Sequence, residues 1–173
     1  MSLIRVERNK NLEPWKRAAL VTAIAAADAA ALATPGYPRA LKPVQVAQFL
    51  LESNWGKADM GAFNYFGIKA REGEPFVAKT THEVIKGKTI EIVAKFRAYK
   101  SMDECFSDHA KLLTSRKRAS GALIYATALS TPNDPVAFAR ALTGIYATDP
   151  AYGDKLETIM KGRGLLETFG FAA

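Results

Sequence analysis

Hydrophobic positions recur at helical spacing along most of this chain. Residues 14–33 and residues 43–52 place small or apolar side chains three and four positions apart, which predicts two largely buried helices. Pro14 suits the first turn of the first helix. The sequence TPGYP at residues 34–38 cannot continue a helix and separates the two.

Between residues 76 and 99 the pattern changes to alternation with period two. β-Branched residues lead to the sequence KGK at 86–88, and residues 89–96 then alternate, which predicts an antiparallel hairpin. With a two-residue turn, Ile85 lies opposite Lys88 or Ile90, and Glu83 shares the face of Ile85. A three-residue turn would alter this register.

The C-terminal half carries helix signals again. Ser101 and Glu104 form a capping box, and residues 121–129 suit a further helix. Asp134 and Asp149 are each followed by proline, which predicts helices over residues 136–144 and 151–161. The fold class is therefore α+β and mostly helical, with one hairpin.

Composition indicates one globular domain. The chain has 173 residues, of which 49% are hydrophobic and 24% charged. We expect a single domain over residues 1–173, with an N-terminal helical extension at about 1–40 and a catalytic core at 41–160. Cys105 is the only cysteine, and neither His82 nor His109 has paired ligands nearby, so we predict no metal and no cofactor.

The net charge of +7 favours an anionic partner such as nucleic acid, a membrane surface or a bacterial wall polymer. Outside residues 116–118 the cations are scattered, which argues against nucleic acid. Lys16 and Arg17 precede an alanine-rich stretch that superficially resembles a signal peptide, but Asp28 within it favours an ordinary helix. No stretch approaches the roughly 20 apolar residues of a membrane span.

Glu52 is the leading candidate for acid chemistry. It ends the second predicted helix, directly after Phe49, Leu50 and Leu51. A carboxyl group there lies at the negative end of the helix dipole and is expected to be partly desolvated. Both effects favour its protonated form, as a general acid for glycosidic cleavage requires. On these features alone, a solvent-facing glutamate is the simpler interpretation.

Four ordered sequence blocks change that balance. They read AQFLLESNWGK at 47–57, NYFGIK at 64–69, FRAYKS at 96–101 and YATDPAYGDKL at 146–156. Together they resemble glycoside hydrolase family seventy-three, the endo-β-N-acetylglucosaminidases that include autolysins, flagellar domains and phage lysins. The resemblance implies a lysozyme-like fold whose hairpin lobe flanks a glycan-binding groove. It also implies hydrolysis of peptidoglycan strands with Glu52 as general acid.

The resemblance also suggests further site residues. Glu83, in the sequence THE, is the candidate second carboxylate, ahead of Glu72, Glu74 and Glu91. It would activate water with inversion, unless the substrate's acetamido group is the nucleophile. Tyr146 is expected to orient that acetamido group or the water. Candidates for substrate binding are Asn64, Phe66, Trp55 and Tyr152, although an aromatic such as Trp55 is more often a core residue.

Alternatives to a glucosaminidase stay open. A lytic transglycosylase or a muramidase would act on the same glycan, and an inactive wall-binding module would keep only the fold. Without a convincing signal peptide, the chain suits a phage lysin or a toxin delivered by type VI secretion, acting in the periplasm or at the wall. A toxin would have a cognate immunity protein as a second partner. Peptidoglycan strands are the expected substrate.

Overall fold

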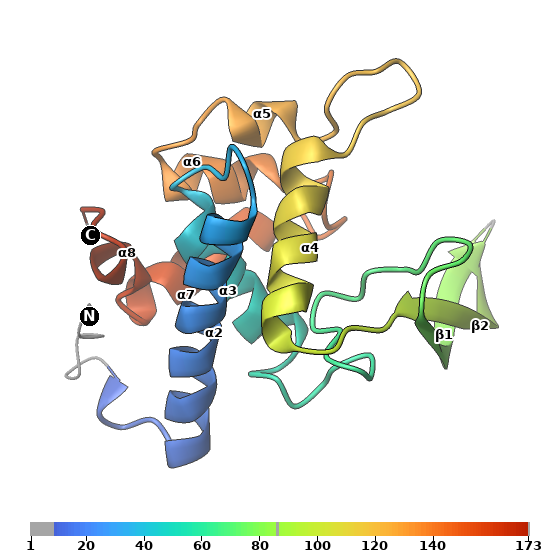
Figure 1. Ribbon diagram of the computed structural model, residues 1–173, viewed down its shortest axis with the longest axis horizontal. Coiled ribbons are helices and arrows are strands. Elements are labelled where there is room, and N and C mark those ends of the chain that lie inside the picture. The colour runs from blue at the N-terminus through green and yellow to red at the C-terminus, as the bar shows by residue number, and fades with distance from the viewer. Residues whose placement is uncertain (1–8, 86, 173) are drawn as a thin grey trace.

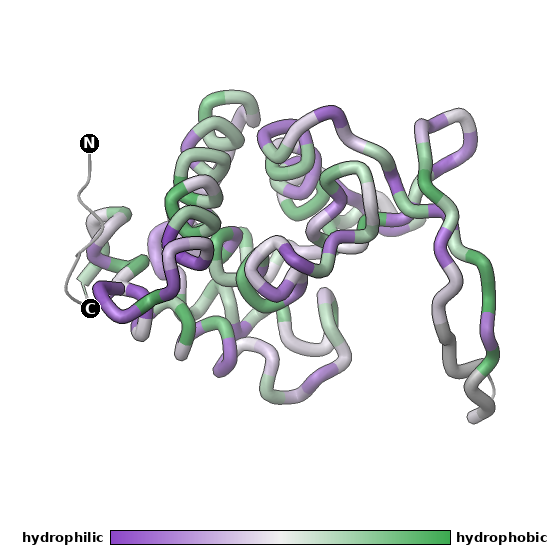
Figure 2. Tube along the Cα trace, turned by 90° about the horizontal axis from the view of Figure 1, so that it is seen from below, coloured by the Kyte–Doolittle hydropathy of each residue, from purple (hydrophilic) through white to green (hydrophobic). Residues whose placement is uncertain are grey.

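The computed structural model describes residues 9–85 and 87–172, with residues 82–85, 88 and 89 described by their backbone alone. Helices form one body, and a two-stranded hairpin projects from its side (Figures 1 and 2). The two predicted N-terminal helices are confirmed as α2 (Pro14–Ala33) and α3 (Leu41–Glu52). The groove described below lies between the hairpin's base and this body.

Helix α3 is the centre of the fold. Its residues 43–50 are all buried, and α2 packs across it with an alanine-rich face. The buried residues of α2 are small apart from one leucine: Leu20, Ala23, Ala26, Ala27 and Ala30. Small side chains allow two helix backbones to approach closely. Asp28 faces outward and forms an ion pair with Lys42 at 2.7 Å.

The predicted hairpin consists of β1 (Phe76–Ile85) and β2 (Lys88–Arg97). The strands pair antiparallel, with Ile85 opposite Lys88 and Glu83 opposite Ile90. Of the two turn lengths that the sequence left open, this register is the one that a two-residue turn gives. Gly87 adopts φ +75°, a conformation that glycine tolerates without steric cost.

Helix α4 (Met102–Ser115) follows the hairpin. The Ser101 hydroxyl accepts from the backbone N–H of Glu104 at 3.2 Å, as the capping box predicts. The Glu104 carboxylate accepts from the backbone N–H of Lys100 rather than from that of Ser101. The cap therefore extends one residue further back and fixes the chain's exit from β2.

The helix predicted over residues 121–129 is mostly absent. Only α5 (Ala126–Leu129) is helical. Gly121 adopts φ +84°, and Lys117 pairs with Leu123 as an isolated antiparallel bridge. Residues 116–124 therefore form a turn that projects beside α4 (Figure 1).

The last helices are α6 (Pro135–Ala141), α7 (Tyr152–Gly162) and α8 (Leu165–Thr168). Asp134 caps α6 as predicted, because its carboxylate accepts from two backbone N–H groups. Asp149 instead binds the N–H of Ala151 within a preceding turn, so α7 begins one residue later than predicted. Helix α8 was not predicted.

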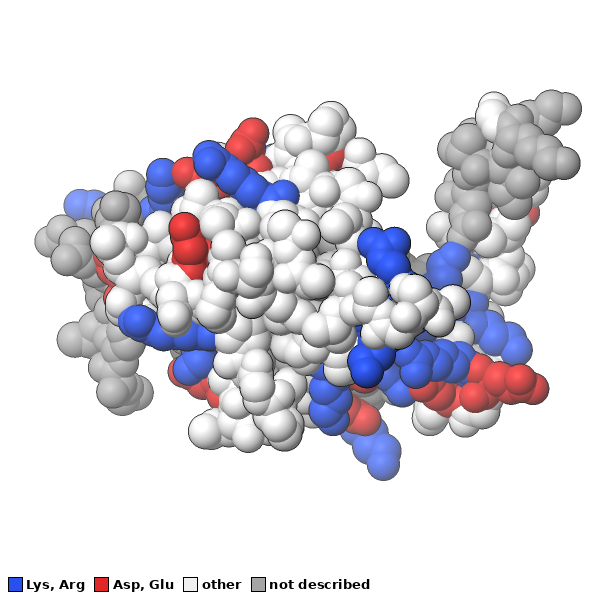
Figure 3. Space-filling model, turned by 90° about the horizontal axis from the view of Figure 1, so that it is seen from above, with Lys and Arg blue, Asp and Glu red and all other residues white. Residues whose placement is uncertain are grey.

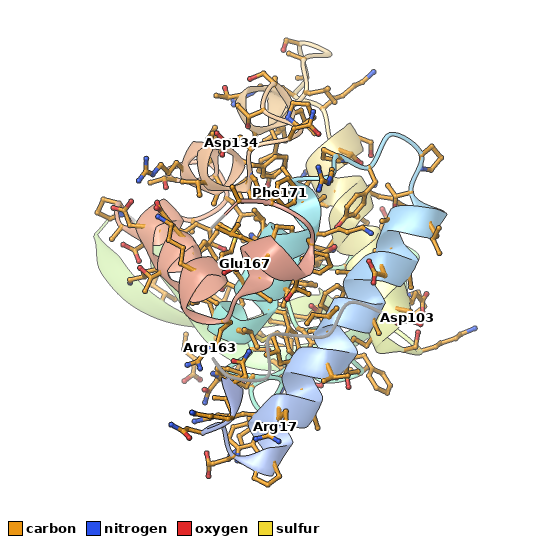
Figure 4. The ribbon with its side chains drawn as sticks, turned by 90° about the vertical axis from the view of Figure 1, so that its left-hand side faces the viewer. Arg17, Asp103, Asp134, Arg163, Glu167 and Phe171 are labelled. Carbon is orange, nitrogen blue, oxygen red and sulfur yellow. The ribbon has the colours of Figure 1, made fainter. Side chains whose placement is uncertain are left out.

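The C-terminal helices close the side of the body opposite the hairpin (Figure 4). The Asn9 side chain donates to the carbonyl of Arg163 at 3.1 Å, which joins the two ends of the described chain. Within residues 9–85 and 87–172, no helix combines the length and apolar character needed to cross a membrane.

Gly153 allows α7 to approach α6 closely. A Cβ atom at this position would lie 2.6 Å from the Cα of Arg140 and 3.1 Å from the hydroxyl of Thr143. We therefore expect Gly153→Ala to lower the free energy of unfolding by about 1–3 kcal/mol, the usual cost of overpacking. Gly162, in the same helix, has nothing within 4 Å of such an atom. Chemical denaturation should show Gly162→Ala as neutral or slightly stabilising; equal losses in both variants would contradict the packing argument.

Candidate active site

A groove with a cavity volume of about 980 Å³ runs between the helical body and the base of the hairpin. Residues 66–71 form one wall and α4 forms another, while Tyr125 and Tyr146 contribute aromatic side chains. Glu52 reaches this groove from the end of α3. The groove is partly open to solvent rather than fully enclosed.

Glu52 is the last residue of the buried helix α3, so the packing of the core sets its backbone position. The Ser53 hydroxyl accepts from Gly56 N at 2.8 Å and donates to Phe49 O at 2.6 Å, which holds the turn that follows. The Glu52 side chain is exposed. Its Oε1 nevertheless takes part in a partly buried hydrogen bond, so the partial desolvation of this carboxylate stays a prediction.

Tyr152 orients Glu52. Its hydroxyl donates to Glu52 Oε1 at 2.6 Å and accepts from Gln48 Nε2 at 3.0 Å. Burial, with Tyr146 and Glu52 nearby, raises the pKa of Tyr152, so the phenol stays protonated and remains a donor. Tyr152 is 3% exposed and does not line the groove. Its place is behind Glu52 rather than against a sugar.

Tyr146 lies in the wall of the groove next to this pair. Its ring stacks on Tyr152 with centroids 5.7 Å apart, and its hydroxyl lies 3.2 Å from His109 Nε2. Burial, together with the negative charge of Glu52, raises the pKa of Tyr146 well above its ordinary value. The structure therefore brings together two of the three predicted catalytic residues.

The predicted substrate-binding residues are placed differently from one another. Phe66 lines the groove, with its inner face stacked on His109 at a centroid distance of 3.8 Å. Asn64 is fully buried, and its amide binds only backbone: it donates to Ile68 O and Arg97 O and accepts from Ile68 N. Asn64 therefore shapes the groove wall without reaching a substrate.

Trp55 lies outside the groove lining. The ammonium of Lys16 and the guanidinium of Arg163 lie 5.8 and 5.2 Å from its ring centroid. Arg163 is on the side of the molecule away from the hairpin (Figure 4). This placement makes Trp55 a link between the helix termini and the loop after Glu52, not a stacking face for sugar.

Of Glu83 in β1, only the backbone lies within the described part, and it pairs with Ile90 of β2. Glu72 and Glu91 are exposed. Glu74 lines the groove, but its carboxylate binds Arg97 and the backbone N–H of Arg71. The identity of the second carboxylate therefore stays a prediction.

Arg97 is a site residue to which the sequence argument gave no role. It binds Glu74 on one side and Asp108 of α4 on the other, the latter at 2.6 Å. The hydroxyl of Tyr99 also donates to Asp108, at 2.7 Å. This network fastens the base of the hairpin to α4. The sequence feature that could have indicated this network is the FRAY sequence, in which an arginine and a tyrosine lie two positions apart at the end of a strand.

Cations dominate the remaining groove surface. Two of its three lining acids, Glu74 and Asp108, are bound to Arg97. The other lining cations are all exposed: Lys69, Arg71, Lys111, Arg116 and Lys117. On the face shown in Figure 3, Lys and Arg side chains gather beside the hairpin. In the described part of the chain, no group of three possible metal ligands occurs.

The sequence is similar to several curated proteins. LytG of Bacillus subtilis, an exo-glucosaminidase, is 37% identical over 123 residues, which cover 70% of this chain and 43% of LytG. A probable N-acetylmuramidase of Lactococcus lactis is 36% identical over 123 residues, 68% of this chain and 28% of that protein. The chain thus spans less than half the length of these relatives.

Solved structures share the fold. The catalytic domain of the autolysin Auto from Listeria monocytogenes superposes with a TM-score of 0.78 at 25% identity, covering 97% of this chain and 98% of that domain. A glycoside hydrolase domain of FlgJ from Salmonella typhimurium gives 0.65 at 30% identity, covering 88% and 97%. The predicted α+β, lysozyme-like fold is therefore confirmed.

A family model described as glucosaminidase, mannosyl-glycoprotein endo-beta-N-acetylglucosaminidase, matches residues 22–165. The match contains α3, the hairpin and α7, and with them all four sequence blocks. It also contains most of α2, which shares one buried core with α3. The chain belongs to the glucosaminidase family, glycoside hydrolase family seventy-three, as those blocks predicted.

Proposed function

We propose that this chain hydrolyses the β-1,4 bond between N-acetylglucosamine and N-acetylmuramic acid in peptidoglycan, with Glu52 as the general acid. The observation that carries the proposal is the hydrogen bond from the buried Tyr152 to Glu52, which lines the groove. Tyr152 engages Oε1, so Oε2 is the oxygen that delivers a proton to the glycosidic oxygen. A fixed carboxyl group beside an open groove is what general acid catalysis requires.

The groove surface suits a polymer with acidic substituents. Phe66 and Tyr146 present aromatic surface beside Glu52, and aromatic rings commonly pack against sugars. The exposed cations along α4 and the loop after Phe66 attract carboxylates such as those of the peptide stems on wall glycans. The Tyr146 hydroxyl lies on the same wall and is suited to bind an acetamido group.

The relatives' names leave the bond to be determined. LytG is described as an exo-glucosaminidase, whereas the Lactococcus relative is described as a probable N-acetylmuramidase. A lytic transglycosylase would also use one acidic glutamate. An inactive wall-binding module is the alternative of another class, and the intact hydrogen bonds of Glu52 and Tyr152 argue against it.

The products distinguish these possibilities. Purified peptidoglycan is digested with the wild-type chain, and the released fragments are reduced with borohydride and identified by mass spectrometry. We expect reduced N-acetylglucosamine at the new ends. Reduced muramic acid would indicate a muramidase and anhydro-muramic acid a transglycosylase, and no release from several wall types would support the binding module.

We also propose that the protein acts as a delivered bacteriolytic enzyme, a toxin or a phage lysin, in the periplasm or at the wall. Directed to the periplasm of a Gram-negative host without any inhibitor, the wild-type chain should lyse the cells, whereas Glu52→Gln should not. A toxin would further need a cognate immunity protein that occupies the groove. Harmless periplasmic accumulation of active wild-type enzyme would contradict the toxin proposal.

A further inference from the structure

A buried polar chain leads from the far side of α3 to the groove. The Tyr37 hydroxyl donates to Gln45 Oε1 at 2.9 Å, and Gln45 Nε2 lies 3.1 Å from His109 Nδ1. His109 Nε2 then lies 3.2 Å from the hydroxyl of Tyr146. Gln45 and His109 are both 0% exposed. The proposed mechanism uses only the last member of this chain, Tyr146.

The orientation of the Gln45 amide is fixed by a neighbour that can only accept. Its Nε2 lies 2.7 Å from the backbone carbonyl oxygen of Phe106. If the amide were flipped, two oxygens would face each other at that distance, so the atom beside Phe106 must be the NH₂ group. The second N–H of this group therefore points at His109 Nδ1, which must carry a lone pair.

The protonation of His109 follows from this arrangement. Burial lowers the pKa of His109 to about 3, so the ring is neutral at any pH at which a wall hydrolase works. A neutral imidazole whose Nδ1 accepts carries its single proton on Nε2. That proton is donated to the oxygen of Tyr146. Stacking on Phe66 fixes the plane of the ring.

We propose that His109 is a positioning residue that holds the Tyr146 hydroxyl as a donor toward the groove. Because the oxygen of Tyr146 accepts from His109, its own proton must point elsewhere, and Tyr146 lines the groove. Bound substrate then offers an acceptor in the form of its acetamido carbonyl oxygen. The inference deepens the proposed function and rests on the assigned role of Tyr146.

Burial also argues against one role for Tyr146. A phenol whose pKa is raised by burial and by the nearby Glu52 carboxylate does not ionise at neutral pH. Tyr146 is therefore not the base that activates water. It donates a hydrogen bond to an acceptor on the substrate, and His109 sets the direction in which the hydroxyl donates.

The tautomer can be tested without any variant of the network. The chain has two histidines, so nitrogen-15 NMR of labelled protein, compared with His82→Asn, assigns the signals of His109. We expect the neutral tautomer protonated on Nε2, unchanged between pH 5 and 8. A proton on Nδ1, or titration near the ordinary value of about 6.5, would overturn the inference.

A double-mutant cycle then tests the link to catalysis. Tyr146→Phe and His109→Leu are each expected to lower kcat on soluble, uncrosslinked glycan strands by about tenfold or more, with a smaller change in KM. The double variant should be no slower than Tyr146→Phe alone, because the two residues act through one hydroxyl. Thermal unfolding of each variant sets an assay temperature at which all of them are folded.

The outcomes separate the inference from the proposed function. Additive losses in the double variant would overturn the positioning role, because His109 would then act by a route other than Tyr146. Wild-type activity in Tyr146→Phe would overturn both the role of Tyr146 and the inference that depends on it. Failure of wild-type protein to cleave any wall would refute the proposed function while the NMR result still decided the tautomer.

Discussion

Glu52→Gln is expected to abolish the digestion of peptidoglycan, with kcat reduced by about a thousandfold, within the usual contribution of general acid catalysis. The amide keeps the shape of the side chain and still accepts from the Tyr152 hydroxyl at Oε1, so the fold should be unchanged. What it lacks is the proton for the leaving oxygen. Release of reducing ends from purified wall, measured with thermal unfolding as a check on folding, gives the result.

Glu13→Gln is the matched control, because Glu13 is exposed just before α2, lies outside the groove lining and is not a candidate for the second carboxylate. It should cleave like the wild type. Equal activity in Glu52→Gln would end the assignment of Glu52. Glu83→Gln separates the two mechanisms. If the wild type inverts the anomeric carbon and Glu83→Gln is inactive, Glu83 acts as a base on the hairpin. If the wild type retains the anomeric configuration and Glu83→Gln stays active, the acetamido group takes part instead.

The position of Glu52 could be predicted because it depends on local sequence. The apolar pattern of residues 43–51 predicts a buried helix, and the resemblance to the family then singles out the glutamate at its end. Its partner could not be predicted in the same way. Tyr152 lies a hundred residues away, and only the packing of α7 against α3 brings its hydroxyl to Oε1.

Side-chain alternation predicted the hairpin, but the sequence left the turn length open, and the register comes from the structure. Prediction failed over residues 121–125, where Gly121 at φ +84° and the Lys117–Leu123 bridge stand in place of the expected helix. The Asp149-Pro150 pair did mark a helix start, and α7 begins within one residue of the expected position. His109 was assigned no chemistry because its neighbours Gln45 and Tyr146 come from other segments.

For Asn64, the sequence suggested a functional contact where the structure shows a structural one. The NYFGIK block suggested a substrate ligand, whereas the amide makes three hydrogen bonds to the backbone of Ile68 and Arg97, at 2.8–3.1 Å. Asn64→Ala leaves these buried groups unpaired, at about 1 kcal/mol or more each. We expect a loss of about 3 kcal/mol in the free energy of unfolding, roughly 6–12 °C in Tm for a chain of this size.

Asn133→Ala is the control, since Asn133 is exposed and lies outside the groove lining, and its Tm should stay within about 1–2 °C of wild type. Activity distinguishes the two roles of Asn64. If the role of Asn64 is structural, Asn64→Ala loses kcat and stability together, and its activity recovers at low temperature as the folded fraction rises. If Asn64→Ala kept the wild-type Tm but raised KM severalfold, the amide would contact the glycan, and the groove wall would have to rearrange when substrate binds.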